Sequence, residues 1–267
     1  MFIDTHVHFN MMVKKEFNTP LPKDAFDKIQ IIITQAQQNN VEKFICAGTS
    51  AIESQNCIEI AQHFPQVFSA VGLHPTDCTE NWKDELDQIK RMLDNKEQNK
   101  IVAIGECGLD KHWYPEKIDL QMDVFKAHAE LAQQYNLPLL IHCRKARDEM
   151  FKCIEEFGSE ITGILHSFFY DLEYAHLAIQ NGFLLGVGGP ISYPKNDDLR
   201  TTIKQIDLKN LVLESDSPYL PPQIIRGQQN QPKYIKYIAE YLANLKESSL
   251  EEVDAKTTSA ACALLNL

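Results

Sequence analysis

The chain alternates short apolar runs with longer amphipathic segments from its first residues to its last. Short apolar runs bounded by turn-forming residues are typical of buried strands. Eight runs fit this description: FIDTHVHF from Phe2, KFICAG from Lys43, VFSAVGLHP from Val67, IVAIGECGLD from Ile101, LPLLIHCR from Leu137, TGILHSF from Thr162, FLLGVGGP from Phe183 and LVLESDSP from Leu211. The pattern therefore predicts eight strands.

Between these runs, apolar residues recur at spacings of three and four, which is typical of amphipathic helices. Clear examples begin at Asp24, Lys117 and Lys233. Eight strands alternating with helices favour the α/β class and a closed (β/α)8 TIM barrel, formed as a single domain of residues 1–267. The alternative is an open, doubly wound sheet. A nucleotide-binding sheet of that kind usually has a glycine-rich turn after its first strand, where this chain has HVHFNMM, so we favour the barrel.

The composition is that of an ordinary globular protein, with 44% hydrophobic and 24% charged residues. The net charge of -11 argues against a surface that coats nucleic acid or anionic membranes, so an anionic substrate must be attracted locally. The seven cysteines form no CxxC pair, which indicates reduced thiols, and no apolar run is long enough to span a bilayer. We therefore expect a cytoplasmic protein without membrane contact, and nothing in the sequence indicates an obligate protein partner.

Residues that can bind metals stand at the ends of the predicted strands. Five of the nine histidines occupy such positions: His6, His8, His74, His142 and His166. The acids Glu106 and Asp216 occupy them as well. Each histidine alone is better explained as a core imidazole or a polar strand end. Barrel enzymes build their active sites at the carboxyl ends of the strands, however, so these motifs together favour a metal site.

The alternation of side chains along a strand predicts which of these residues face one another. Residues two apart on a strand face the same side, so His6 and His8 can converge on one ion. The same alternation places Asp4 with them inside the barrel and Ile3 outside it. We expect Asp4 and Glu214, both inward-facing acids, to orient ligand imidazoles.

Six candidate ligands suit two metal ions better than one, with the Glu106 carboxylate as a bridge between them. The six are His6, His8, Glu106, His142, His166 and Asp216. Two divalent ions among these ligands would leave a positive surplus, which favours an anionic substrate. The mixed nitrogen and oxygen donors leave Zn²⁺, Mn²⁺ and Mg²⁺ open as the native ions, with Mg²⁺ less expected from ligand softness.

Seven motifs resemble, in order, those of the TatD family of metal-dependent deoxyribonucleases: FIDTHVHF, GLHP, GECGLD, LPLLIHCRKA, ILHSF, ESDSPYL and RGQQNQP. The resemblance spans nearly the whole chain, and LLGVGGPISYPKNDDLR is most similar to the YjjV-like branch. It implies a barrel of the amidohydrolase superfamily that hydrolyses phosphodiesters with one or two divalent ions, typically as a 3′ to 5′ exonuclease. It also implies that the six candidate ligands occupy the family's metal-binding positions, and that magnesium supports activity.

The expected reaction is hydrolysis of a phosphodiester, at single-stranded DNA ends or in another small substrate, by a metal-activated water molecule. Asp216 is expected to orient this water and accept its proton. His74, Arg144 and His112 are expected to contact the phosphate or sugar of the substrate. Two alternatives stay open: a metal-dependent ester or amide hydrolase, such as a D-aminoacyl-tRNA deacylase, and a barrel that holds metals without catalysis.

Overall fold

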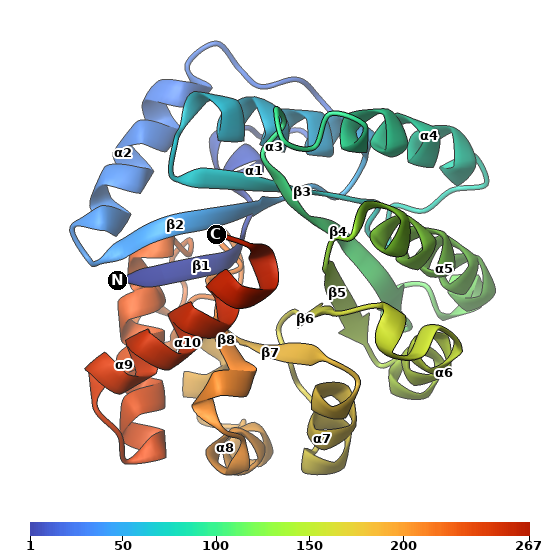
Figure 1. Ribbon diagram of the computed structural model, residues 1–267. Helices are drawn as coiled ribbons and strands as arrows, with labels where there is room; N and C mark the ends of the chain where they lie inside the picture. Colours follow the sequence, from blue (N-terminus) through green and yellow to red (C-terminus); the bar gives the residue numbers. More distant parts are fainter.

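Eight parallel strands pair in the order in which they occur along the chain, in a computed structural model that describes residues 1–267 (Figure 1). They are β1 (Phe2–Val7), β2 (Val41–Ala47), β3 (Val67–Val71), β4 (Ile101–Asp110), β5 (Leu139–Arg144), β6 (Gly163–Leu165), β7 (Phe183–Val187) and β8 (Leu211–Leu213). A parallel bridge between Val7 and Ser217 joins β1 to the chain beyond β8, so the sheet nearly closes on itself. The predicted (β/α)8 barrel is confirmed.

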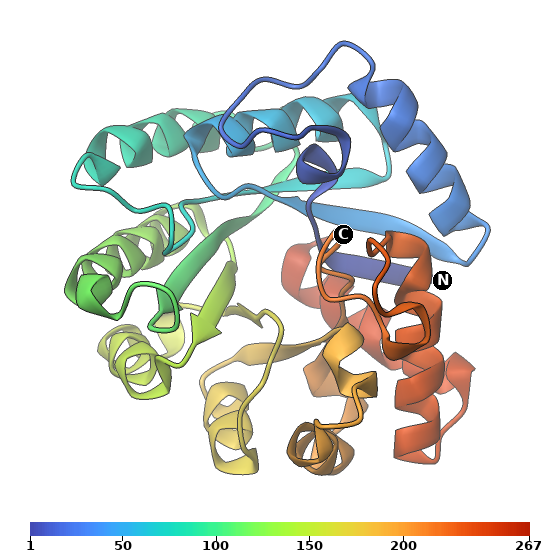
Figure 2. The same cartoon turned by 180° about the vertical axis from the view of Figure 1, so that it is seen from behind.

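Ten α-helices accompany this sheet (Figures 1 and 2). Most of them lie on its outer side, whereas α10 lies across the end of the barrel where β1 begins. They are α1 (Phe9–Val13), α2 (Ala25–Gln37), α3 (Ala51–His63), α4 (Trp82–Leu93), α5 (Ile118–Tyr135), α6 (Arg147–Phe157), α7 (Leu172–Gln180), α8 (Asp197–Gln205), α9 (Ile235–Lys246) and α10 (Leu250–Leu265). The helices predicted from Asp24, Lys117 and Lys233 correspond to α2, α5 and α9. None of the ten combines the length and the apolar character that crossing a bilayer requires.

Several helices begin where the sequence supplies a side chain to cap them. Ser50 accepts a hydrogen bond from the Glu53 backbone N–H at the start of α3, and Asp171 accepts one from the Tyr174 N–H at the start of α7. Ser249 caps α10 in the same way. Each bond satisfies one of the backbone donors that the first turn of a helix leaves free. Local sequence thus determines where these helices start.

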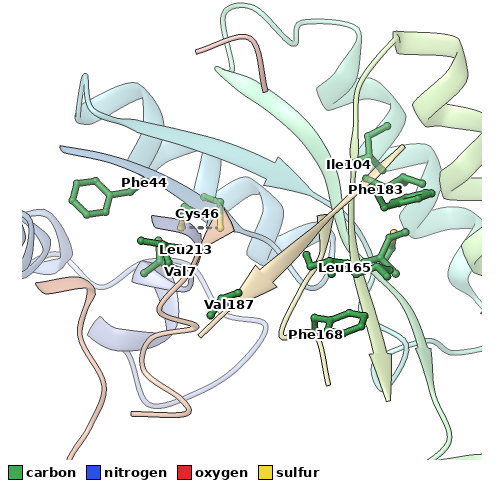
Figure 3. Close-up of a cluster of buried hydrophobic side chains, with 14 of the residues drawn as sticks. Val7, Phe44, Cys46, Ile104, Leu165, Phe168, Phe183, Val187 and Leu213 are labelled. Atoms are coloured by element: carbon green, nitrogen blue, oxygen red, sulfur yellow. Dashed lines mark hydrogen bonds between the residues drawn. The ribbon is translucent and has the colours of Figure 1, made fainter. Parts of the chain in front are cut away.

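Apolar side chains form one cluster on each side of the sheet. The outer cluster of 59 buried residues fills the space between strands and helices, and Figure 3 shows part of it. Alternate residues of β2 illustrate the division, because Phe44 and Cys46 belong to the outer cluster while Ile45 and Ala47 belong to the inner one. The inner cluster fills the barrel and includes Leu265 of α10. The carboxyl ends of the strands are left for polar side chains.

Strand β1 departs from the strict alternation that the sequence predicts. Ile3 belongs to the inner cluster, so the prediction that it faces outward is wrong. The register of β1 against β2 shifts between Asp4 and Val7, where β1 carries one residue more than its neighbour. Such an extra residue redirects the side chains that follow it. Val7 therefore packs under the helices, and His6 faces the interior of the barrel.

Candidate metal centre

The six predicted ligands come from separate parts of the chain and meet at the carboxyl ends of the strands. His6 lies in β1 and His8 just beyond it, Glu106 lies in β4, His142 lies in β5, His166 follows β6, and Asp216 follows β8. Five of the six are buried, and His142 is partly exposed. The barrel therefore brings together residues that are separated by as many as 210 positions along the chain.

The backbone of β4 directs Glu106 into this cluster. The register of β4 against β5 shifts between Ile104 and Cys107, where β4 carries one residue more than its neighbour. Gly105 has a φ of +147°, and a Cβ at this position would lie 2.4 Å from the backbone oxygen of Leu140. Only glycine fits these two conditions, which explains the glycine that precedes Glu106.

Four ligand atoms form the first group. The Nε2 atoms of His6 and His8 lie 3.1 Å apart, and Oε2 of Glu106 lies 3.3 Å from the first and 3.6 Å from the second. Oδ1 of Asp216 lies 3.5 Å from His8 Nε2 and 4.0 Å from His6 Nε2. Ligands at about 2.1 Å from a tetrahedral ion stand about 3.4 Å from one another. The spacing of these four atoms therefore fits a divalent cation.

The second oxygen of Glu106 faces a second group. Its Oε1 lies 3.2 Å from Nδ1 of His142 and 4.0 Å from Nε2 of His166. It also lies 3.5 Å from Nε2 of His74, which the sequence suggested only as a substrate contact. Nε2 of His166 lies 3.8 Å from Oδ2 of Asp216. One carboxylate thus contacts two separate sets of ring nitrogens, as a bridging ligand does.

Contacts on the far side of the rings leave the inward nitrogens free to bind a cation. Nδ1 of His8 donates to the backbone oxygen of Ala47 at 2.9 Å, so its Nε2 carries a lone pair in the neutral ring. Nδ1 of His166 lies 3.0 Å from Oε1 of Glu214, and the Ser167 backbone N–H donates to the same oxygen at 2.6 Å. Glu214 therefore holds the orientation of His166 from outside the cluster.

Asp110 has a comparable position beside His142, although it is not among the residues predicted from the sequence. Its Oδ2 lies 3.0 Å from Nε2 of His142, and its Oδ1 accepts hydrogen bonds from the backbone N–H groups of His112 and Trp113. Asp110 follows Glu106 by four positions in β4, and residues four apart on a strand share a face. That spacing was the signal that could have found it.

The pKa shifts show how strongly the cluster attracts positive charge. Burial raises the pKa of the Glu106 carboxyl, yet His74 and the other imidazoles around it bring this pKa well below its usual range. Burial disfavours the charged form of His166, but the carboxylates of Glu214 and Asp216 raise its pKa to about 10. The Glu106 carboxylate therefore stays ionised and attracts cations. A divalent cation can replace the imidazole protons, because metal ligation requires neutral rings.

A cavity of about 940 Å³ opens onto this cluster, within the usual range for ligand sites. Two of the predicted substrate contacts, His74 and Arg144, line it. His112 does not line the cavity; its ring packs edge-on against Trp113 with 4.8 Å between the ring centroids. The predicted contact between His112 and substrate therefore gains no support from the geometry, and the roles of the other two stay predictions.

A parallel barrel with imidazoles and carboxylates clustered at the carboxyl ends of its strands has the architecture of the barrel hydrolases that use divalent ions. The family model described as TatD related DNase matches residues 3–266. The chain therefore belongs to the TatD family, and the resemblance inferred from its motifs is confirmed.

Relatives cover the chain from end to end. YabD of Bacillus subtilis, described as an uncharacterized metal-dependent hydrolase, is 32% identical over 100% of both chains. YjjV of Escherichia coli carries the same description and is 29% identical, over 94% of this chain and 93% of its own. The crystal structure of the E. coli TatD homologue YjjV superposes with a TM-score of 0.88 and 27% identity, covering 100% of this chain and 98% of that one. The barrel is thus shared along its whole length with a member of the predicted branch.

Proposed function

We propose that the protein is a divalent-metal-dependent hydrolase of phosphodiester bonds that acts as a 3′ to 5′ deoxyribonuclease on single-stranded DNA. The observation that carries the proposal is the bridging position of Glu106, whose two oxygens face two groups of ring nitrogens. Pairs of divalent ions about 3.5 to 4 Å apart are typical of enzymes that cleave phosphate esters. The description of the family as DNases supports a nucleic acid as the substrate.

In this proposal the six residues divide between two ions. His6, His8 and Asp216 would hold the first ion, His142 and His166 would hold the second, and Glu106 would be shared between them. His166 also groups with His6 and Glu106, so it lies within reach of both positions. His74 is within reach of the second ion, because its Nε2 lies 3.5 Å from the same oxygen of Glu106 as Nδ1 of His142. Zn²⁺ and Mn²⁺ suit this nitrogen-rich set better than Mg²⁺. When bound, the ions would lower the pKa of a water molecule and stabilise charge on a phosphoryl oxygen.

Asp216 is the residue proposed to hold the attacking water and accept its proton. Burial raises the pKa of its carboxyl, but the imidazoles of His166 and His8 lower that pKa below its usual value. The carboxylate is therefore ionised at neutral pH and can act as a base. Arg144 stands exposed on the cavity wall, where a guanidinium can bind a phosphate through two parallel hydrogen bonds.

The test uses metal-loaded protein, single-stranded DNA labelled at its 5′ end, and a D-aminoacyl-tRNA. We expect the wild-type protein to shorten the DNA stepwise from its 3′ end and to leave the aminoacyl ester intact. Asp216→Asn should lose this activity, whereas Asp123→Asn, which changes an exposed carboxylate on α5, should keep it. Deacylation of the D-aminoacyl-tRNA without DNA cleavage would contradict the nuclease function and support an ester hydrolase. Inertness towards both substrates would contradict both enzymatic functions.

A further inference from the structure

Aromatic side chains are exposed mainly around the cavity of the candidate metal centre. Six aromatic side chains of the protein are exposed, and four of them line this cavity. They are Phe17 (62% exposed), Trp113 (60%), Phe169 (55%) and Tyr219 (43%). Phe17 lies in the loop between α1 and α2, and the other three lie in the loops that follow β4, β6 and β8. Apolar surface gathered in this way usually marks a binding site.

The loop segments that carry Phe17 and Trp113 are tied to buried carboxylates. Glu53, which has no exposed surface, accepts hydrogen bonds from Nζ of Lys14 and from the Asn18 backbone N–H, both at 2.7 Å. These two contacts lie on either side of Phe17. The Trp113 backbone N–H donates to Oδ1 of buried Asp110 at 2.9 Å. Both rings are therefore exposed on a backbone that is held in place.

Tyr219 and Phe169 are fixed in a similar way. The Tyr219 N–H donates to the Asp216 backbone oxygen at 2.7 Å, and Nδ2 of buried Asn230 donates to the Tyr219 backbone oxygen at 2.7 Å. Phe169 directly follows Phe168, which is buried in the outer cluster. A ring whose backbone is already ordered loses little freedom when a ligand stacks on it. The four rings thus form a preorganised surface.

The charges at this surface indicate what kind of ligand it accepts. Arg144 and Lys145 line the same cavity, although the protein as a whole carries a net charge of -11. The guanidinium carbon of Arg144 lies 5.7 Å from the centre of the Trp113 ring. Exposed aromatic rings next to cations are typical of sites for single-stranded nucleic acid, where bases stack on the rings and cations contact the backbone. A duplex offers no such free base faces along its length.

We propose that Phe17, Trp113, Phe169 and Tyr219 form stacking subsites for the bases of a single-stranded nucleic acid at the mouth of the cavity. Arg144 and Lys145 contact its backbone phosphates. The inference rests on the proposed function in one respect, since the phosphodiester to be cleaved would lie at the metal centre. Stacking itself is measurable without turnover, which allows the two proposals to be tested separately.

The test compares two hydrolysis-resistant phosphorothioate ligands on metal-loaded protein: a thymidine tetranucleotide and an abasic chain of the same length. Affinities come from the fluorescence anisotropy of the labelled ligands. We expect the base-bearing ligand to bind at least about 100-fold more tightly, and Trp113→Ala to reduce this preference about 5- to 100-fold. Trp113→Phe, which keeps a ring, should retain most of it. Tyr237→Ala, which removes an exposed ring on α9 outside the cavity, is the matched control.

A second measurement uses the natural fluorescence of the protein, which has two tryptophans, Trp82 and Trp113. In Trp82→Phe the remaining indole is Trp113, and the tetranucleotide should quench it while the abasic chain should not. Equal affinity for the two ligands, or equally tight binding of duplex DNA, would overturn the stacking subsites. If the protein cleaved single-stranded DNA but bound the base-bearing and abasic chains equally, the stacking subsites would be overturned and the nuclease function would stand. Base-dependent binding without any cleavage would support the stacking subsites and contradict the nuclease function.

Discussion

Replacement of Gly186 by alanine is the most direct test of how Glu214 supports the candidate metal centre. Gly186 lies in β7, and a Cβ at this position would stand 2.2 Å from Oε2 and 2.7 Å from Cδ of Glu214. Glu214 has no exposed surface, and its other oxygen contacts the Ser167 N–H at 2.6 Å and Nδ1 of His166 at 3.0 Å. The carboxylate cannot move into solvent, so the new methyl group must break these contacts.

The expected loss of stability follows from how far the Glu214 carboxylate must move. An ordinary contact of the new Cβ is 3.4 Å or longer, so the carboxylate must retreat by about 1.2 Å. Losing a buried hydrogen bond to a charged acceptor costs about 1.5 to 3 kcal/mol, and overpacking costs about 1 to 3 kcal/mol. Because the two costs partly overlap, we expect the free energy of unfolding to fall by about 2 to 4 kcal/mol. His166 also loses the partner that orients it, so metal affinity should fall about 10- to 100-fold.

Gly188→Ala is the matched control, because a Cβ at Gly188 meets its nearest atom, the Glu214 backbone oxygen, at 3.5 Å. Guanidinium unfolding of the metal-free proteins measures the change in stability, and calorimetric titration with Zn²⁺ or Mn²⁺ measures the change in affinity. We expect Gly188→Ala to resemble wild type in both. The reasoning would be refuted if Gly186→Ala unfolded within about 0.5 kcal/mol of Gly188→Ala and bound metal equally well.

Three further predictions concern stability, metal binding and the loop between α1 and α2. Burial lowers the pKa of His128 from 6.5 to about 4, so between these pH values its side chain is protonated in the unfolded chain but neutral in the folded protein. This difference lowers the free energy of unfolding by about 3 kcal/mol as the pH falls from 6.5 to 4, whereas above pH 6.5 the contribution is complete. Urea unfolding should show a smaller loss over this range in His128→Gln, and parallel plots of unfolding free energy against pH for the two proteins would contradict this. Zn²⁺ at 100 times its Kd should raise Tm by about 5 to 10 °C and a chelator should reverse the rise, whereas an unchanged Tm in calorimetry would argue against binding to the folded state. Glu53→Gln removes the partner of the buried Lys14 ammonium and should speed proteolysis within residues 14–24, while the exposed Glu59→Gln should not; equal cleavage would show that Glu53 does not hold the loop.

The eight strands and the clustering of the six candidate ligands were predictable because both depend on local patterns. Short apolar runs determine which segments become strands, and a parallel barrel brings the carboxyl ends of all its strands together. His6, Glu106 and Asp216 could therefore be assigned to one site without any knowledge of tertiary contacts. The assignment needed only the position of each polar residue relative to its apolar run.

The direction of individual side chains was less predictable, because it depends on how neighbouring strands pair. The extra residues in β1 and β4 arise where each strand is matched to its neighbour, and a period of two in the sequence does not reveal them. Ile3 was assigned to the wrong face for this reason. His74 lies in the loop after β3, so its approach to Glu106 depends on the path of that loop. The exposed rings around the cavity also lie on loops, where periodicity carries no information.

Strand β4 carries a candidate ligand and, because of its length, also the residue that anchors the loop beyond it. It has ten residues, more than any other strand, and it continues past Glu106 to Asp110. The Asp110 carboxylate contacts His142 with one oxygen and fixes the Trp113 backbone with the other. A ligand of the candidate metal centre and a ring of the proposed stacking surface therefore share one buried anchor. A displacement of the loop after β4 would also move Asp110, so the proposed base binding at Trp113 and the proposed metal binding at His142 would be coupled through this carboxylate.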